Sequence, residues 1–221
     1  LGGQFLLAGA ISAKKDFKNA VDKMILDVQE SGIEVHLNTV CTKEMIEEIK
    51  PDALIVAIGS SPFVLPIEGS EKAIIAHDVL SEKVEVPGDH VVIIGGGLVG
   101  FETAEFLAAR QKKVTVLEMK EKALQDLGPL RQITAQFAMA QMPITIETSA
   151  NVERIDDHVV VASGKEYPYD SVIMAVGSKA NDTSMYADLD IPTYIVGDCK
   201  KAGIALDAFK DAYHAVLEIN K

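Results

Sequence analysis

The chain has 221 residues, 48% of them hydrophobic, and 33 acidic against 21 basic side chains give it a net charge of −12 at pH 7. This composition is typical of a folded globular protein, and so acidic a surface disfavours nucleic acid and anionic lipid as partners. Because no apolar run approaches the ~18 residues of a membrane span and the start lacks the basic residues of a signal peptide, we expect a cytoplasmic protein without membrane contact.

The first half of the chain predicts helices that alternate with strands. The expected elements, in chain order, are a helix over 15–31 that Gly32 ends, a strand over 33–38, a helix over 42–50 and a strand over 53–58. The last of these is apolar throughout, so we expect it to be covered on both faces in a parallel sheet. Residues 60–89 are rich in Pro and Gly, which indicates a connector with a short helix near 77–81 and a domain boundary near Pro87.

The second half predicts a longer series of strands and helices. The expected elements are a strand from His90, a helix to about Gln111, a strand over 113–118, a helix from Pro129, strands over 143–148, 171–176 and 194–196, and a last helix over 204–219. Two short alternating runs, 152–155 and 158–161, indicate an antiparallel meander inserted among the parallel strands.

Three glycines directly after a predicted strand form the pattern GxGxxG. The pattern needs one glycine for a sharp turn, one for the approach of the backbone to a diphosphate and one for close helix packing. The helix that follows turns its N–H groups and the positive end of its dipole toward the diphosphate. We therefore predict that the turn binds a dinucleotide. The residues assigned to it are Gly95, Gly96, Gly97, Leu98, Val99 and Gly100.

Glu118 gives this pattern the context that it lacks alone. It ends the next predicted strand, about twenty residues after the glycines, where a carboxylate accepts hydrogen bonds from both ribose hydroxyls. The same carboxylate repels a 2′-phosphate, although the nearby Lys120 and Lys122 offset part of that repulsion. The pair of features predicts NAD(H) as the ligand rather than NADP(H).

Other strand ends are weaker candidates. Gly59 and Gly177 each end an apolar strand at the sheet edge where nucleotides bind, and a plain strand-ending turn is an equally good interpretation. Gly197 and Asp198 end a third strand. The Asp198 carboxylate can accept a hydrogen bond from a ligand hydroxyl, but a cap on the following helix is the favoured interpretation.

Several polar side chains receive no firm role. Glu102, early in the helix after the glycines, is equally well a neighbour of nicotinamide or a partner of the helix dipole, and we read Glu105 as an exposed dipole partner. The five histidines lack metal-ligand spacing and a nucleophile partner. Cys41 and Cys199 are too far apart in sequence to form a CxxC pair. We predict no metal site.

Taken together, VVIIGGGLVGFETAEFLA, VTVLEM, a later strand ending in AVG, and YIVGDC before a closing helix resemble a known family. The chain is similar to the C-terminal half of the NADH:flavin oxidoreductases related to 2,4-dienoyl-CoA reductase, 2-enoate reductase and trimethylamine dehydrogenase. The resemblance implies an α/β protein with two Rossmann-like domains of the glutathione-reductase type. A truncated FAD-type domain over 1–86 and 181–221 would be interrupted by an NAD(H)-binding domain over 87–180.

The resemblance also implies roles for the weaker candidates and reveals what is missing. Gly59 and Gly177 would match two cofactor-binding turns, and Gly197 with Asp198 the contact to the ribityl chain of FAD. No match to the family's FAD glycine pattern, FMN-binding barrel or iron–sulfur cysteines occurs in the sequence, and two isolated cysteines cannot ligate a cluster. We therefore expect a fragment that binds FAD weakly or not at all. FMN and the cluster would belong to an N-terminal barrel in the same or a neighbouring chain.

The function that this resemblance implies is electron input, in which NADH gives a hydride to a flavin. Such a transfer needs positioning and exclusion of water more than an acid or base, so we expect no catalytic side chain. Two alternatives are a fragment of a pyridine-nucleotide disulfide reductase, for which the cysteines supply no dithiol, and a non-catalytic dinucleotide-binding or interaction module. A sheet edge uncovered by truncation would also favour a homo-oligomer.

Overall fold

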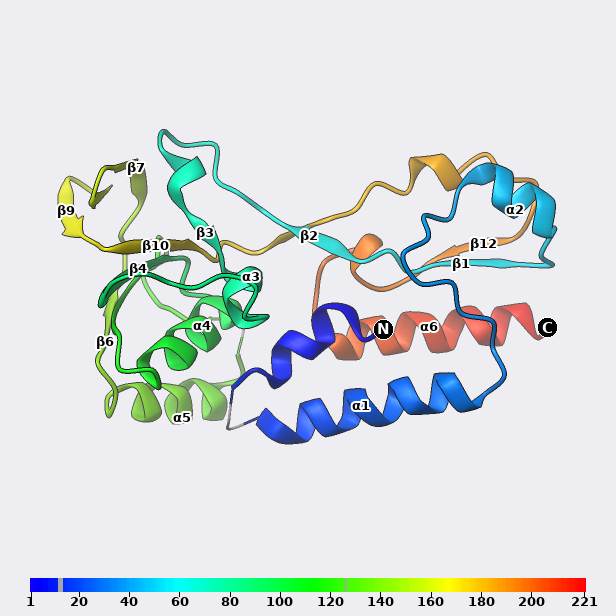
Figure 1. The fold of residues 1–221 in the computed structure, drawn as a ribbon, viewed down its shortest axis with the longest axis horizontal. Coiled ribbons are helices and arrows are strands. Elements are labelled where there is room, and N and C mark those ends of the chain that lie inside the picture. The colour runs from blue at the N-terminus through cyan, green and yellow to red at the C-terminus, as the bar shows by residue number, and fades with distance from the viewer. Residues whose placement is uncertain (12–13, 126) are drawn as a thin grey trace. The chain divides into compact units, whose positions relative to one another are not determined.

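The computed structural model describes residues 1–11, 14–125 and 127–221, and the chain is a mixed α/β protein with a parallel sheet, as predicted (Figure 1). Two compact units form within it. The larger unit consists of 2–27 and 62–177, and the smaller unit of Leu1, 28–61 and 178–221. Residues 2–27 and 62–86, which we expected in the FAD-type domain, therefore belong to the larger unit, and residues 178–180, expected in the NAD(H)-binding domain, belong to the smaller unit. The units divide after residue 61 and not near Pro87. The assignment of the units to FAD and NAD(H) remains a prediction.

A five-stranded sheet forms the centre of the larger unit, and all its strand pairs are parallel. Its strands, in spatial order, are β3 (Ile74–Ile75), β10 (Ser171–Met174), β4 (His90–Ile94), β5 (Lys113–Leu117) and β6 (Ile144–Glu147). The chain runs from β4 through β5 to β6 on one side and returns to β10 on the other side of β4. The strand order therefore reverses at β4. The four longer strands confirm the predictions, whereas β3 was missed because it has only 2 residues.

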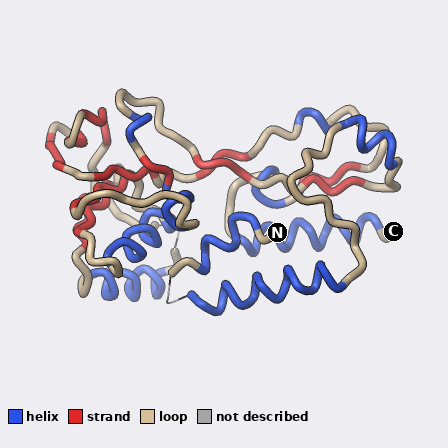
Figure 2. The backbone as a smooth tube through the Cα atoms, viewed as in Figure 1, coloured by secondary structure: helices blue, strands red, loops and turns tan. Residues whose placement is uncertain are grey.

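Each face of this sheet is covered by a different layer (Figure 2). Helices α3 (Ala76–Leu80) and α4 (Leu98–Ala108) pack on the face that contains Val91 and Ile93. The alternate side chains Val92 and Ile94 pack toward an antiparallel meander. That meander consists of β7 (Val152–Asp156), β8 (Val159–Ala162) and β9 (Lys165–Pro168). The apolar strand runs are thus covered on both faces, as a parallel sheet requires.

The remaining helices follow the predicted spacing. Helix α5 (Pro129–Met139) begins at its proline and buries Met139 beside Phe101. Helix α1 (Lys15–Glu30) follows a 3₁₀ helix, η1 (Gly3–Gly9), and buries Val21. No helix in the described part of the chain is both long and apolar enough to cross a membrane.

The smaller unit has a parallel pair of strands and two helices. Its elements are α2 (Lys43–Ile49), β1 (Leu54–Val56), β12 (Thr193–Ile195), α6 (Ala205–Ile219) and the 3₁₀ turns η4 (Ser184–Tyr186) and η5 (Gly197–Cys199). Thr42 caps α2, because its side-chain oxygen accepts the N–H of Met45 at 3.4 Å. Ile46 packs with Val56 in the core of this unit. Strands β2 (Ser60–Pro62) and β11 (Ser178–Ala180) pair with each other. In the larger unit, the 3₁₀ turn η3 (Ser70–Lys72) precedes β3.

Two predictions for the smaller unit are wrong. Residues 33–38 form no strand, and Ile33 and Leu37 are 63% and 60% exposed. The alternation in this segment would place its apolar side chains on one face of a strand. The described residues offer no neighbouring strand for the segment to pair with. Strand β1 forms as predicted but is not covered on both faces, since Ile55 is 40% exposed.

Candidate dinucleotide site

The glycine turn begins at the carboxyl end of β4, where the strand order reverses. Ligands of open α/β sheets bind at such switch points. Gly95 has a φ of 109°, in the region that favours glycine, and its N–H donates to the carbonyl of Leu117 at 2.8 Å. A Cβ added there would lie 2.4 Å from the carbonyl oxygen of Ala175, at the end of β10. This position therefore requires glycine for both conformation and space.

The other two glycines of the pattern differ in what surrounds them. A Cβ at Gly100 would lie 1.9 Å from the carbonyl oxygen of Gly95, so this glycine lets α4 pack against its own turn. A Cβ at Gly97 would meet nothing within 4 Å. The protein's own packing does not need a glycine at Gly97, which leaves an open approach to the backbone. The first N–H groups of α4, from Leu98 and Val99 on, have no acceptor within the helix. They form the positive end of the helix dipole, which faces this approach.

Glu118 follows the end of β5 and lies against this turn. Its side chain is buried, with 7% of the residue exposed. One carboxylate oxygen, Oε2, accepts the N–H of Gly96 at 2.8 Å, and the other, Oε1, accepts the N–H of Lys120 at 2.8 Å. The structure therefore brings Glu118 to the glycines, as the spacing predicted. Sequence reasoning missed its bond to the turn, because a spacing specifies a strand end but not a side-chain direction.

A cavity of about 290 Å³ lies beside the loop that follows β5 and Glu118. Its lining consists of Phe101, residues 121–124, Gln132, Ile146 and Thr148. The loop itself is attached to the turn, because the N–H of Leu124 donates to the carbonyl of Gly96 at 3.0 Å. A larger cavity, of about 420 Å³, lies at the opposite edge of the sheet beside His90 and Lys113, at the amino ends of their strands. That position is remote from the glycines, whereas the smaller cavity borders the loop that Leu124 attaches to the turn.

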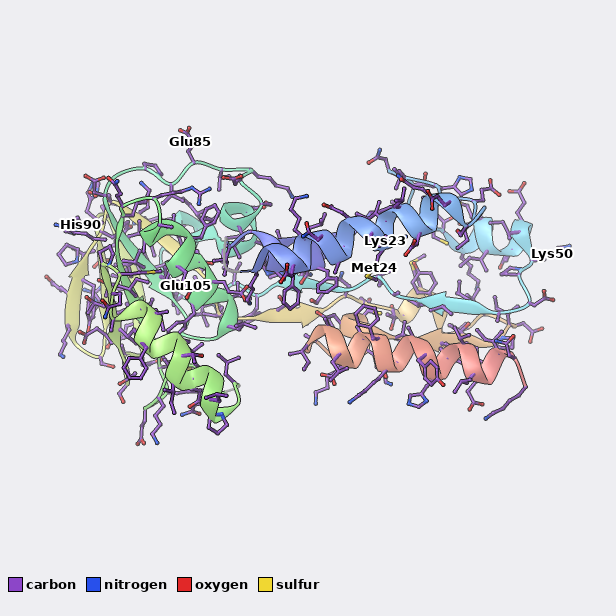
Figure 3. All side chains as sticks on the ribbon, turned by 90° about the horizontal axis from the view of Figure 1, so that it is seen from below. Lys23, Met24, Lys50, Glu85, His90 and Glu105 are labelled. Carbon is purple, nitrogen blue, oxygen red and sulfur yellow. The ribbon has the colours of Figure 1, made fainter. Side chains whose placement is uncertain are left out.

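Acidic side chains of α4 are more buried than predicted. Glu102 is 7% exposed and forms an ion pair with Lys14, the residue before α1. Burial raises the pKa of Glu105, the charge of Lys14 opposes that rise, and the charge of Glu102 adds to it. Glu105 is labelled in Figure 3. The prediction of an exposed Glu105 is wrong, since the residue is half-buried. Sequence reasoning could not find Lys14, because 88 positions separate it from Glu102.

Gly59 and Gly177 are both turns with room around them. Their φ angles are 71° and 97°, and a Cβ at either would meet nothing within 4 Å. In the smaller unit, the carbonyl of Gly59 accepts the N–H of Asn181 at 3.1 Å. In the larger unit, the carbonyl of Gly177 accepts the N–H of Phe63 at 2.9 Å. Conformation thus explains both glycines, and the open space leaves the cofactor interpretation standing as a prediction.

Asp198 does not cap the last helix, so the favoured interpretation of this residue is wrong. The N-cap position of α6 is Ile204, which makes no side-chain cap. Instead, Asp198 accepts the hydroxyl of Ser60 at 3.0 Å and the N–H of Gly203 at 3.3 Å. These bonds hold the loop before α6 to the start of β2. Gly197 precedes Asp198 with a φ of 66°.

The described residues contain no group of three or more His, Cys, Asp or Glu side chains arranged to hold a metal ion. Cys41 is exposed and Cys199 is buried, where the Cys199 thiol donates to the carbonyl of Val56 at 3.2 Å.

A parallel sheet with a glycine turn at its switch point and a buried carboxylate after the neighbouring strand defines a Rossmann-type α/β protein. Residues 7–207 match the model of the pyridine nucleotide-disulphide oxidoreductase family, and the chain belongs to this family. It is therefore a member of an oxidoreductase family.

Known relatives match nearly the whole chain. It is 34% identical to a cinnamate reductase of Clostridium sporogenes over 99% of its own length and 34% of that protein. It is 32% identical to an NADH oxidase of Thermoanaerobacter brockii over 99% of its length and 36% of that protein. A solved 2-naphthoyl-CoA reductase complex superimposes with a TM-score of 0.87 at 29% identity, over 96% of this chain and 34% of that one. The chain thus spans about a third of the length of these relatives.

Proposed function

We propose that this chain is the NAD(H)-binding electron-input module of a longer, flavin-dependent oxidoreductase related to enoate and 2,4-dienoyl-CoA reductases. The observation that carries the proposal is the glycine turn at the switch point with the Glu118 carboxylate bound to it. The name of the NADH oxidase relative supports NADH as the electron donor. The names of the cinnamate and 2-naphthoyl-CoA reductases support an unsaturated or aromatic acid derivative as the final acceptor.

The turn and Glu118 would bind different parts of the nucleotide. The backbone at Gly97 and the N–H groups that open α4 bind the diphosphate, and Glu118 accepts the ribose hydroxyls. A bound nicotinamide nucleotide supplies the hydride. The chain itself holds that nucleotide in one orientation and keeps water away from it, so no acid or base from the protein takes part.

The choice between NADH and NADPH tests this proposal. A buried carboxylate at the ribose opposes a second negative charge, so we expect NADH to bind at least about tenfold more tightly than NADPH. Isothermal titration calorimetry of the purified chain with both nucleotides measures the difference. Equal affinities, or binding of neither nucleotide, would overturn the cofactor assignment.

We infer that the longer enzyme also uses FAD. The open turns at Gly59 and Gly177 suit a cofactor that approaches the backbone, and Gly197 with Asp198 would contact its ribityl chain. The adenosine half of FAD would be bound by a segment outside this chain, as would FMN and an iron–sulfur cluster. A single hydrogen bond to a charged group contributes only ~1.5–3 kcal/mol, whereas micromolar binding needs ~8 kcal/mol.

The flavin content of the purified chain tests this part of the proposal. We expect a colourless protein that does not retain FAD through gel filtration, with absorbance at flavin wavelengths as the measurement. Stoichiometric FAD on the isolated chain would contradict the inferred division of the FAD site between this chain and another segment.

A further inference from the structure

We propose that Glu118 is a positioning residue for the glycine turn as well as the acceptor for the ribose hydroxyls. It would hold the turn in the shape that binds the diphosphate, whichever nucleotide is present. The inference rests on the proposed function for the identity of the ligand. The hydrogen bonds that carry it belong to the protein alone.

Three hydrogen bonds hold the turn and the loop after β5 in place, and two of them join the turn to the loop. Two converge on the carboxylate, where Oε2 accepts the N–H of Gly96 and Oε1 accepts the N–H of Lys120, both at 2.8 Å. The third returns from the loop, because the N–H of Leu124 donates to the carbonyl of Gly96 at 3.0 Å. The peptide groups on both sides of Gly96 are therefore held by the loop, directly before the backbone that faces the diphosphate.

The lack of space around Gly96 supports the same conclusion. Gly96 occupies a variable position of GxGxxG, so the motif does not require a glycine there. Yet a Cβ at Gly96 would lie 2.8 Å from the Cβ of Glu118 and 2.9 Å from its Oε2. The glycine lets the turn approach the carboxylate closely enough to donate its N–H. Glu118 thus explains why the sequence carries a third consecutive glycine.

The carboxylate can support the turn and bind ribose at the same time. Each carboxylate oxygen can accept two hydrogen bonds, and the N–H groups occupy one position on each. The free positions remain for the two ribose hydroxyls. Because the residue is 7% exposed, its loss would leave the Gly96 N–H unpaired in a buried place, which favours a rearranged turn.

This arrangement predicts how cofactor specificity responds to mutation. If Glu118 only selected against a 2′-phosphate, Glu118→Ala would improve the binding of NADPH. If it also positions the turn, the same substitution weakens NADH and NADPH together, because both use the diphosphate site. A change of preference from NADH to NADPH would then need a residue at position 118 that still accepts the Gly96 N–H.

The experiment uses two diphosphate ligands that differ only at the ribose, ADP and its 2′,3′-dideoxy analogue. We expect Glu118→Ala to weaken the dideoxy analogue about tenfold or more, although this ligand has no hydroxyl for the carboxylate to accept. Glu118→Gln, which keeps the size and can accept one of the two N–H groups, should give an intermediate loss. Glu85→Ala removes an exposed carboxylate (Figure 3) and should leave both affinities unchanged.

Three outcomes separate the two proposals. Unchanged affinity of Glu118→Ala for the dideoxy analogue, with weaker ADP binding, would overturn the positioning role and leave the proposed function intact. Failure of the wild type to bind ADP, NADH or NADPH would overturn the proposed function. Amide hydrogen exchange without ligand then tests the positioning role alone. We expect faster exchange at Gly96 in Glu118→Ala than in wild type, and equal rates in two folded proteins would overturn the role.

Discussion

Gly97, at the start of α4, and Gly100, within its first turn, should differ in how their substitution affects stability. Gly97 has a φ of −80° and an extended ψ of −172°, a conformation open to any residue, and space for a side chain. Gly97→Val should therefore fold with a melting temperature close to that of the wild type. Gly100→Ala would place its methyl group against the carbonyl of Gly95, and overpacking of this kind costs about 3 kcal/mol. Thermal unfolding of both variants measures the contrast, and equal stability would contradict the geometry of the turn.

Asp170 makes the start of β4 sensitive to acid. Its carboxylate accepts the N–H groups of His90 and Asp89, both at 2.8 Å, and these bonds hold the pKa of Asp170 below its usual value. A carboxyl with a lowered pKa in the folded state stabilises the fold above its unfolded-state pKa, and this contribution is lost as the pH falls through the folded-state value.

We therefore expect Asp170→Asn to lower stability at neutral pH and to approach the wild type in acid. Denaturant unfolding at a series of pH values measures this difference. A gap between the two proteins that stays constant down to strongly acidic pH would show that the carboxylate charge is not the cause.

At the scale of elements, the ion pair of Lys14 and Glu102 joins the segment before α1 to α4 within the larger unit. Loss of one partner from a buried pair leaves an uncompensated charge. Because the Lys14 side chain is 19% exposed, we expect Lys14→Met to lower the free energy of unfolding by about 3 kcal/mol, at the lower end for such pairs.

A double-mutant cycle tests whether the charge is the cause. Glu102→Gln combined with Lys14→Met should recover much of the stability that Lys14→Met loses, because no buried charge remains. Additive losses in the unfolding free energy would show that the two side chains act independently.

Strands could be predicted from the sequence where the segment has a strand-like hydrophobic pattern and the fold supplies a neighbouring strand to pair with it. Strands β4, β5 and β10 are apolar and lie between neighbours, so their prediction held. Residues 33–38 alternate apolar and polar side chains, as a strand does, but have no partner strand among the described residues. In the site, spacing alone located the glycines and Glu118. It could not reveal the Glu118–Gly96 bond or the Lys14–Glu102 pair, because these depend on side-chain direction and on contacts between residues distant in sequence.

At the scale of the whole molecule, apolar surface in the smaller unit points to self-association. Strand β12 exposes 38% of Ile195, and α6 exposes Phe209, Tyr213 and Val216 at 49%, 63% and 46%. Apolar side chains gathered in this way on an amphipathic helix and a sheet favour a further contact. We propose that copies of the chain cover these surfaces mutually when no other segment does so.

Sedimentation velocity over a range of concentrations tests this proposal. We expect species larger than a monomer, and more of them at higher salt, because screening weakens the repulsion between chains of charge −12. A single monomeric species at all concentrations would contradict it, and so would Phe209→Ser and Tyr213→Ser variants that associate as the wild type does.

The most direct test of NADH binding at the glycine turn is a fluorescence titration of the wild type and Gly97→Val with NADH. The chain has no tryptophan, so the emission of bound NADH can be followed without overlap from indole groups. We predict saturable binding to the wild type and a loss of at least about a hundredfold in affinity in folded Gly97→Val, because the branched side chain fills the approach to the diphosphate site. Equal binding by the two folded proteins would contradict the account, because the glycines would then serve the fold alone.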